Sequence, residues 1–396
     1  MKRQRHIVRR AAAAAAATLA LGTALAGPHV HATQITYTVT GSTQMFILGN
    51  LLASKYTSTL SGVQIAVNPT SSQTGFDDTC QGGNSQVGMS DSYIQDSQLR
   101  EQPNGTSCAD MTGIPVAISA TPAIYNLPGA YFQQRQASDG FTPVHPVRLT
   151  AQVIASIYQG QVKTWNDPAI ASLNPGMKLP AHKIVVYSTS EPGGAGYVFD
   201  QWLAQSVPSW NATVGQTTLQ TPWPPYSTLL PSQSAMVQQI KATPYSFGYA
   251  GFDYALGAKV QAAALRNASG VFVTPSLNGL AAAISQAIND GLPEDFRKSF
   301  VLVKDPRSGE HAFNPASFEF FIVHKNLAVH GVSPQVAQAI KSFLVWDVAD
   351  NGGQAYIKEL NFRDVTNHKL TVGDIPVPTA LRKIIQATAN GLTTGS

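Results

Sequence analysis

Charged residues are scarce in this sequence, and acidic residues are absent from it before Asp77. Only 12% of the 396 residues are Asp, Glu, Lys or Arg, against 43% hydrophobic residues. Five of the basic residues lie within the first ten positions. Without them, Lys and Arg number 21 against 22 Asp and Glu. The body of the chain therefore lacks the basic surplus that nucleic-acid binding requires, and no nucleic-acid partner is expected.

Long apolar runs are also missing after the N-terminal region. A membrane-spanning helix needs about 18 or more consecutive apolar residues, so we expect the mature chain not to span a membrane. Met1–Arg10 is basic and Ala11–Ala26 is apolar, and cleavage sites of the small-x-small type end at Ala26 and Ala32. This layout predicts a signal peptide over residues 1–32, with an N-terminal amphipathic helix that is retained as the alternative.

Export leads to the periplasm or the medium. No Cys lies near either cleavage site, so a lipid anchor is not expected. The sequence has only two cysteines, Cys80 and Cys108. In an oxidising compartment they are expected to form a disulfide, which would stabilise the fold by roughly 3–4 kcal/mol, and two free thiols are the alternative. Neither has a Cys or His partner at ligand spacing, so no metal and no cofactor are expected.

Short apolar runs alternate with helical patterns along the chain. The runs that predict buried strands are Gln64–Val67, Ile114–Ile118, Lys183–Tyr187, Phe247–Tyr249 and Phe318–Val323. The patterns that predict helices are Phe46–Thr57, Ala151–Tyr158, Gly196–Ala204, Leu277–Asn289 and Pro334–Asp347. This alternation predicts an α/β fold with mainly parallel sheets, in which ligands bind where strands lead into helices.

Three of these strand-to-helix junctions are rich in hydroxyl groups and small residues. They are Thr38–Thr43, Asn68–Gly75 and Ser188–Gly196. A helix N-terminus offers unpaired backbone N–H groups and a partial positive charge, and together these features favour an anion. Each junction taken alone is also explained by ordinary helix capping. Their joint occurrence favours a shared anion-binding site.

At this point the sequence resembles the PstS family of periplasmic phosphate-binding proteins. Leu149–Gly160 is similar to that family's "L-x-x-I-Y-x-G" helix, and Lys163–Gly176 to its "K-x-W-x-D-x-x-I…N-P-G" motif. Tyr245–Tyr249 resembles the "GAIGY" strand, and Phe318–Lys325 the late "F-I-L-I-H-K" strand. The resemblance covers most of the mature chain.

The resemblance implies an α/β fold of two lobes, each a mixed sheet flanked by helices, joined by a two-strand hinge. The expected division is residues 33–115 plus about 313–396 for lobe I and about 116–312 for lobe II. It also implies a monomer that captures inorganic phosphate or a related small solute for the permease of an ABC transporter.

The family's ligand contacts fall on specific residues of this chain. Thr43 matches the Thr of the first loop, with Ser42 and Gln44 beside it, and Ser71 or Ser72 matches the Ser of the second loop. Asp91 matches the carboxylate that accepts a proton from hydrogen phosphate, which lets a site reject sulfate. The alternative role for Asp91 is a helix N-cap.

The third loop departs from the family's "R-x-D-G-S-G-T". The Arg position falls on Ser188 or Thr189, and Glu191 matches the Asp. Gly193 or Gly194 and Ala195 stand where the family has Ser and Thr. Loss of a charge-assisted bond from Arg costs about 1.5–3 kcal/mol. The sequence therefore leaves open weak phosphate binding with backbone help, or a neutral or cationic ligand.

Two other functions follow from these observations. A changed third loop without a lipid anchor is compatible with a secreted or surface protein that acts in adhesion or signalling. A phosphatase would need a nucleophile with its base, or two metal ions. His311, His324 and His330 do not have metal-ligand spacing, so an enzyme is not expected.

Overall fold

The computed structural model describes residues 34–60, 62–83, 85–100, 106–128, 146–215, 219–291, 311–367 and 373–395. Gln34–Ser396 form one compact unit. The predicted signal peptide lies outside the described residues. None of the helices in the described part of the chain is long and apolar enough to cross a membrane.

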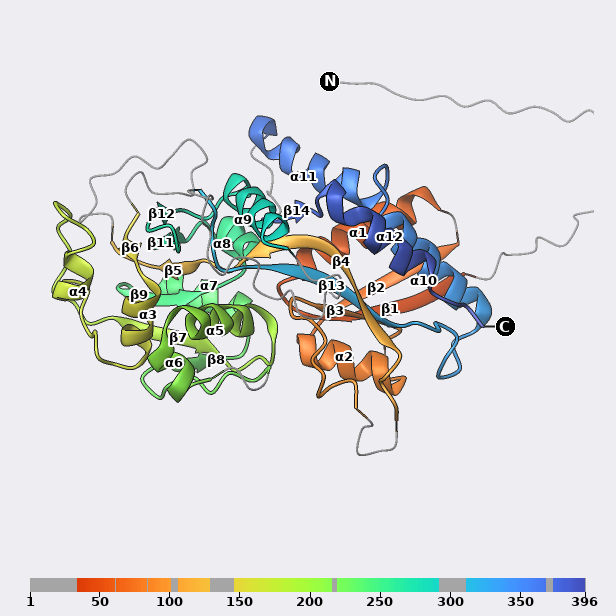
Figure 1. The fold of residues 1–396 in the computed structure, drawn as a ribbon, viewed down its shortest axis with the longest axis horizontal. Helices are drawn as coiled ribbons and strands as arrows, with labels where there is room; N and C mark the ends of the chain where they lie inside the picture. Colours follow the sequence, from red (N-terminus) through yellow and green to blue (C-terminus); the bar gives the residue numbers. More distant parts are fainter. Residues whose placement is uncertain are drawn as a thin grey trace, which may run out of the picture. The chain divides into compact units, whose positions relative to one another are not determined.

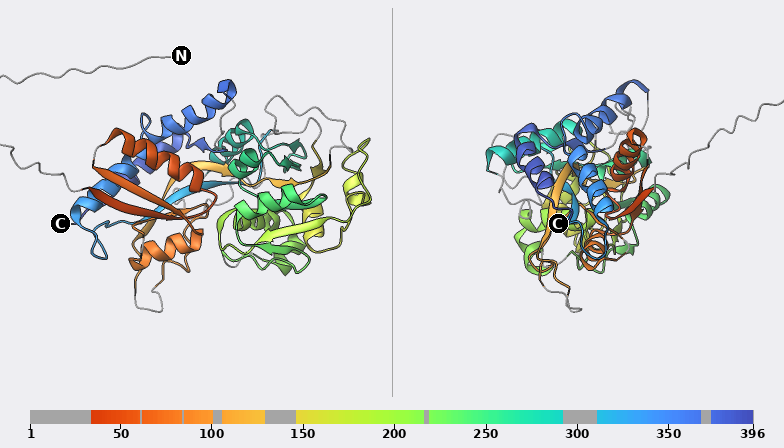
Figure 2. Two further views of the ribbon diagram at one scale, coloured as in Figure 1. Left: turned by 180° about the vertical axis from the view of Figure 1, so that it is seen from behind. Right: turned by 90° about the vertical axis from the view of Figure 1, so that its right-hand side faces the viewer.

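The first lobe is built on a six-stranded sheet. Its strands, in spatial order, are β14 (Ile375–Pro376), β4 (Met111–Ala120), β13 (Ala316–His324), β3 (Val87–Ser90), β1 (Ile35–Gly41) and β2 (Val63–Pro69). Helix α2 (Ser72–Gln81) packs on one face, and α1 (Phe46–Thr59), α10 (Pro334–Asp347) and α12 (Thr379–Asn390) lie on the other (Figures 1 and 2). Helix α11 (Gly353–Asn367) packs beside β14.

The second lobe is built on a five-stranded sheet. Its strands, in spatial order, are β10 (Gln261–Ala262), β5 (Ala123–Tyr125), β9 (Ser246–Tyr249), β7 (Val185–Thr189) and β8 (Thr228–Leu230). A small third sheet has the order β12 (Phe272–Val273), β11 (Ala264–Arg266) and β6 (Arg148–Leu149). The helices between these strands are α3 (Ala151–Tyr158), α4 (Pro168–Ala171), α5 (Gly194–Ser206), α6 (Pro208–Thr213), α7 (Gln233–Ala242), α8 (Phe252–Ala258) and α9 (Leu277–Asn289).

Aromatic side chains fill the core of the second lobe. Tyr249 of β9 stacks on Phe199 of α5, with ring centroids 4.9 Å apart, and on Trp223 at 5.1 Å. Tyr158, at the end of α3, packs against Trp223 at 5.0 Å and against Trp210 at 6.2 Å. These contacts pack α3, α5 and α6 against β9.

Strands β4 and β13 pair along their full length and lead from one lobe to the other. Both are buried almost throughout, as expected of central strands with continuous apolar sequences. Their register shifts between Glu319 and Phe320, opposite Pro115. Proline has no N–H to donate to the ladder, which accounts for the irregularity at this point. Beyond the ends of the two strands, the Thr121 N–H donates to the carbonyl of Pro315 at 3.1 Å.

The sheets are mixed, as the resemblance implied, and the expectation of mainly parallel sheets was wrong. β1 runs parallel to β2 and β3, but β13 runs antiparallel to β3 and β4. The antiparallel pairs arise because the chain crosses between the lobes and returns beside its own path. The residue boundaries of the lobes stay a prediction, since β4 continues through the expected boundary at Pro115.

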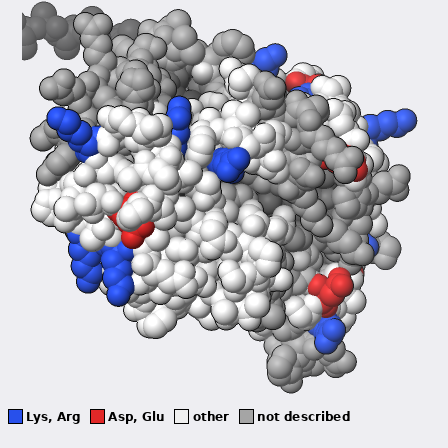
Figure 3. All heavy atoms as spheres, turned by 60° about the vertical axis from the view of Figure 1, so that its left-hand side comes forward, with Lys and Arg blue, Asp and Glu red and all other residues white. Residues whose placement is uncertain are grey.

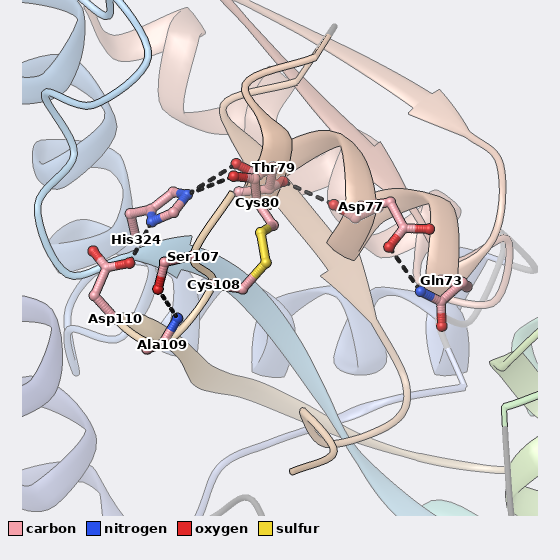
Figure 4. The surroundings of a disulfide bond; sticks show 10 residues. Gln73, Asp77, Thr79, Cys80, Ser107, Cys108, Ala109, Asp110 and His324 are labelled. Atoms are coloured by element: carbon pink, nitrogen blue, oxygen red, sulfur yellow. Dashed lines mark hydrogen bonds and ion pairs between the residues drawn. A yellow bond between two sulfur atoms is a disulfide. The ribbon is translucent and has the colours of Figure 1, made fainter. Parts of the chain in front are cut away.

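The predicted disulfide between Cys80 and Cys108 is present (Figure 4). It joins the last turn of α2 to the segment that precedes β4. Beside it, His324 of β13 contacts the carboxylate of Asp110 at 2.7 Å, and its other ring nitrogen lies 3.2 Å from the carbonyl of Thr79. The disulfide and the histidine together attach α2 to the central strands of the first lobe.

Candidate ligand-binding site

The first loop, Ser42–Gln44, connects β1 to α1 and is buried. The Ser42 hydroxyl accepts a hydrogen bond from the backbone N–H of Gln44 at 3.1 Å, which holds the turn before the helix. The Thr43 hydroxyl lies 2.9 Å from both carboxylate oxygens of Glu191. Because Thr43 follows β1 and Glu191 follows β7, this contact joins the two lobes.

The second loop forms the start of α2. Ser71 is the N-cap of the helix and accepts a hydrogen bond from the backbone N–H of Thr74 at 3.0 Å. Ser72 is the first helical residue, and its hydroxyl donates to Asp91 Oδ1 at 2.6 Å. The two serines therefore have different roles: Ser71 caps the N-terminus of α2, whereas Ser72 orients the carboxyl group of Asp91.

Asp91 follows β3 and is fully buried. The described residues directly after it, 92–100, form no helix, so it is not a helix N-cap. Its second oxygen, Oδ2, makes no hydrogen bond. Burial raises the pKa of Asp91 to about 6, although the hydroxyls of Ser72 and Ser42 and the backbone N–H of Gly194 act to lower it. An unpaired buried acceptor costs about 1–3 kcal/mol, so a ligand hydroxyl that donated to Oδ2 would be favoured.

The third loop approaches the second through two glycines in the left-handed region. Gly193 and Gly194 have φ of 82° and 66°. A Cβ on Gly193 would lie 2.7 Å from the Cβ of Ser72. A Cβ on Gly194 would lie 3.5 Å from Asp91 Oδ2 and 3.6 Å from Glu191 Oε1. The glycines thus allow the backbone to pass where Ser or Thr side chains would collide or be strained.

The N-termini of α2 and α5 consequently meet beside Asp91. Gly193 is the N-cap of α5 and supplies no side-chain acceptor, and Ala195 in the first turn is buried. Backbone N–H groups at such helix ends are donors for an anion. The arrangement thus combines N–H donors with one unpaired carboxylate oxygen.

Glu191 faces the same region and is only 8% exposed. Its pKa is raised to about 8, mainly by burial and also by the negative charge of Asp91, although the Thr43 hydroxyl acts to lower it. Near neutral pH this side chain is therefore mostly a carboxylic acid, which can donate a hydrogen bond as well as accept one.

Ser188 and Thr189 have hydrogen-bond partners within the second lobe. The Ser188 hydroxyl pairs with that of Ser227 at 2.7 Å, and the Thr189 hydroxyl pairs with that of Tyr249 at 2.8 Å. Both hydroxyls come from β7, the strand that leads into the third loop. Their predicted role as ligand contacts stays a prediction, as does that of the other predicted site residues.

Two residues at this site were missed by sequence reasoning. Gln233, at the start of α7, donates to the Thr43 hydroxyl at 3.2 Å and accepts from the backbone N–H of Gly251 at 2.6 Å. The hydroxyl of Tyr254 donates to the Thr43 carbonyl at 2.8 Å. Thr43 is thus held by three side chains of the other lobe, and no local sequence signal marks Gln233 or Tyr254 for this role.

Acidic side chains dominate the buried charged residues of the described chain. Seven of them are buried: Asp91, Glu191, Asp200, Asp253, Glu319, Asp347 and Asp374. No Lys or Arg is buried among the described residues. The face seen in Figure 3 is mostly uncharged, with scattered Lys and Arg and few acids. Nor do the described residues include a group of three or more His, Cys, Asp or Glu placed to hold a metal ion.

Comparisons with known proteins agree with this geometry. The family model described as the PBP superfamily domain matches residues 26–322. The phosphate-binding protein PstS of Xylella fastidiosa strain 9a5c is 30% identical over 303 residues, which cover 76% of this chain and 70% of that protein.

Solved structures share the fold. A putative phosphate ABC transporter substrate-binding protein with bound phosphate from Clostridium perfringens has a TM-score of 0.53 and 14% identity. That match covers 87% of this chain and all of the other. A high affinity periplasmic phosphate-binding protein bound with phosphate has a TM-score of 0.61 and 18% identity, covering 91% and 96% of the two chains.

The match to the family model includes the loops that carry Thr43, Ser72 and Asp91. The chain therefore belongs to the PBP superfamily and, within it, to the PstS family of solute-binding proteins.

Proposed function

We propose that this chain is an exported solute-binding protein that captures phosphate, or a related oxyanion that carries a proton, between its two lobes. The observation that carries the proposal is the fully buried, unpaired Oδ2 of Asp91 beside the N-termini of α2 and α5. The helix N-termini favour an anion, whereas the carboxylate oxygen requires a hydroxyl donor. Hydrogen phosphate satisfies both conditions, and sulfate satisfies only the first.

Groups of known position from the second and third loops would hold such a ligand. Ser72 orients Asp91, the glycines at 193 and 194 allow the backbone of the third loop to approach, and Glu191 as a carboxylic acid would act as a donor. The described site supplies no buried Lys or Arg. We therefore expect weaker binding than a site with Arg would give, by roughly ten- to hundred-fold, since one charge-assisted hydrogen bond is worth about 1.5–3 kcal/mol.

The names of the relatives support the rest of the proposal. They are phosphate-binding PstS proteins, and one structural neighbour is a putative ABC transporter substrate-binding protein with bound phosphate. We propose that this chain acts as a monomer in the periplasm or the medium, delivers its solute to the permease of an ABC transporter, and catalyses no reaction.

The test is a calorimetric titration of ligand-stripped protein with phosphate and with sulfate, for wild type and Asp91→Asn. Wild type is expected to bind one phosphate and to bind sulfate at least ten-fold more weakly. The asparagine amide would donate rather than only accept, so the variant should lose at least ten-fold in phosphate affinity and gain in sulfate affinity. Asp347→Asn, which changes another buried carboxyl on α10, is the matched control and should bind both anions as wild type does.

Equal affinity of wild type for phosphate and sulfate would contradict the proposed role of Asp91. Unchanged anion binding by Asp91→Asn would contradict it as well.

A second candidate is a secreted or surface protein whose ligand carries a cationic group. It is favoured by one observation: Asp91 and Glu191 face the same point with no basic side chain buried near them. A thermal-shift screen of phosphate against aminoalkylphosphonates and polyamines separates the two. Stabilisation by a cationic solute, together with none by phosphate, would replace the first proposal by this one.

A further inference from the structure

Three buried carboxyl groups meet where the two lobes join, beside the candidate site. Glu319 lies in the middle of β13, Asp253 lies on α8 of the second lobe, and Asp374 comes directly before β14 of the first lobe. The exposed fractions of the three side chains are 0%, 3% and 1%. We name these three residues the junction carboxyls.

The chain segments that carry them are in direct contact. A Cβ on Gly373 would lie 2.6 Å from the backbone nitrogen of Asp253, so the segment before β14 lies against the start of α8. A Cβ on Gly251 would lie 2.8 Å from Asp253 Oδ1 and 2.9 Å from Cγ of Gln44. The start of α8 is therefore packed between two segments of the first lobe, and a movement that separated α8 from these segments would break these contacts.

The junction carboxyls have almost no hydrogen-bond donors. Within the described part of the chain, both oxygens of Glu319, both of Asp374 and Oδ2 of Asp253 have no hydrogen-bond partner. Asp253 Oδ1 accepts one bond, from the backbone N–H of Tyr254 at 2.7 Å. The Gln44 amide lies close enough to Glu319 to act toward lowering its pKa, but it makes no hydrogen bond of ordinary length.

The charged and titratable groups that face these carboxyls are acids or a phenol. Asp91 faces both Glu319 and Asp253, Asp253 and Asp374 face each other, and Tyr254 is adjacent on α8. The Ser119 hydroxyl faces Asp374. No Lys, Arg or His among the described residues pairs with any of the three.

Such a group of acids can be buried only if it holds protons. Burial raises the pKa of Glu319 and of Asp253, and in both cases the nearby Asp374 raises it further. Burial also raises the pKa of Asp374 to about 7. If the lobes separated, water would reach the carboxyls and their pKa values would return toward the ordinary range of about 4.

We propose that closure of the two lobes takes up protons at the junction carboxyls, so that the protein is closed in acidic conditions and opens in alkaline conditions. The closed arrangement brings acids from α8, β13 and the segment before β14 together without a counter-charge, and the open arrangement separates them. The first loop of the candidate site takes part in this change, because Gln44 is next to Thr43 and contacts Gly251. Release of a bound solute would therefore be favoured by a rise in pH.

Small-angle X-ray scattering of the ligand-free protein, from pH 5 to pH 9, tests this proposal without reference to any ligand. The radius of gyration of wild type should increase as the pH rises. In Glu319→Gln the amide cannot ionise and the side chain keeps its shape. The pH midpoint of opening should then move up by at least about one unit, or the opening should be lost.

Asp347→Asn is the matched control, since Asp347 is equally buried and its carboxylate has no hydrogen-bond partner, but only burial raises its pKa. It should open as wild type does. A wild-type radius that is constant with pH would overturn the proposal, and so would identical opening of wild type and Glu319→Gln. If circular dichroism shows that Glu319→Gln is unfolded, Asp374→Asn takes its place with the same criteria. Failure of phosphate binding would leave these outcomes unchanged.

Discussion

Glu191 gives the sharpest prediction about affinity. In the closed site its pKa is raised to about 8 by burial, from an ordinary value of 4.5, whereas in an open site it would meet water. Between pH 4.5 and pH 8, Glu191 holds a proton in the closed form that it lacks in the open form. Closure then takes up one proton at Glu191, and the binding constant falls by about ten-fold for each unit of rising pH.

The perturbation is Glu191→Gln, which keeps the size of the side chain and an acceptor for the Thr43 hydroxyl but removes the titration. Calorimetry with phosphate at pH 6 and pH 8 gives the affinity of both proteins at each pH, and comparison at the same pH cancels the titration of phosphate itself. The ratio of the variant's affinity to that of wild type should rise by about 50-fold between the two pH values, because Glu191 in the closed site is already half ionised at pH 8.

Asp347→Asn serves as the control, and its ratio to wild type should be the same at both pH values. A ratio for Glu191→Gln that does not change with pH would refute the assignment of a closure-linked proton to Glu191.

Four further predictions follow from other parts of the structure. Replacement of Cys80 and Cys108 by Ser should lower the free energy of unfolding by about 3–4 kcal/mol in urea titrations, because it removes the constraint on the unfolded chain; an unchanged urea midpoint would count against a structural disulfide. Gly193→Ala should weaken phosphate binding at least ten-fold with a small loss of thermal stability, since its Cβ would lie 2.7 Å from that of Ser72 with φ at 82°; full affinity would show that the close approach is not needed. Asp347→Asn should raise the melting temperature more at pH 8 than at pH 5, because burial raises the pKa of Asp347 and the cost of its ionisation grows as the pH rises; an equal change at both pH values would contradict this sign. Hydrolysis of a generic aryl phosphate should be undetectable with or without Zn²⁺ or Mg²⁺, and turnover that follows the purified protein would reverse the proposed absence of catalysis.

Many strands and helices of the fold can be predicted from local sequence patterns. The apolar runs at Phe247–Tyr249 and Phe318–Val323 lie within strands β9 and β13, and the helical patterns at Ala151–Tyr158, Leu277–Asn289 and Pro334–Asp347 coincide with α3, α9 and α10. These segments are strongly apolar with a clear period, so local sequence determines their structure. The helix α11 was not anticipated, because its sequence is polar on average.

Strand direction could not be predicted in the same way. Alternation of strands and helices favours parallel sheets, but β13 returns antiparallel to β4 after nearly 200 residues of the second lobe. Only the resemblance to a two-lobe family carried that information. The pairing of Cys80 with Cys108 was predictable, since export and the presence of just two cysteines leave one intramolecular partner for each.

The candidate site was predictable where it follows the family's pattern. Thr43, Ser72 and Asp91 lie in one region because β1 pairs with both β2 and β3, and the three residues follow the ends of β1, β2 and β3. The contacts of Ser188 and Thr189 depend on Ser227 and Tyr249, which are far away in sequence, so local reasoning could not identify them. The junction carboxyls were not anticipated either, since Asp253, Glu319 and Asp374 approach one another only in the folded chain.

The most direct test of the central claim is a calorimetric titration with phosphate at pH 7.5, where Asp91 with a pKa of about 6 is ionised, on protein freed of ligand by unfolding and refolding. One phosphate bound per chain, with sulfate at least ten-fold weaker, is the predicted result. Absence of binding heat with phosphate, in protein whose circular dichroism shows a folded state, would contradict the claim that this site captures phosphate.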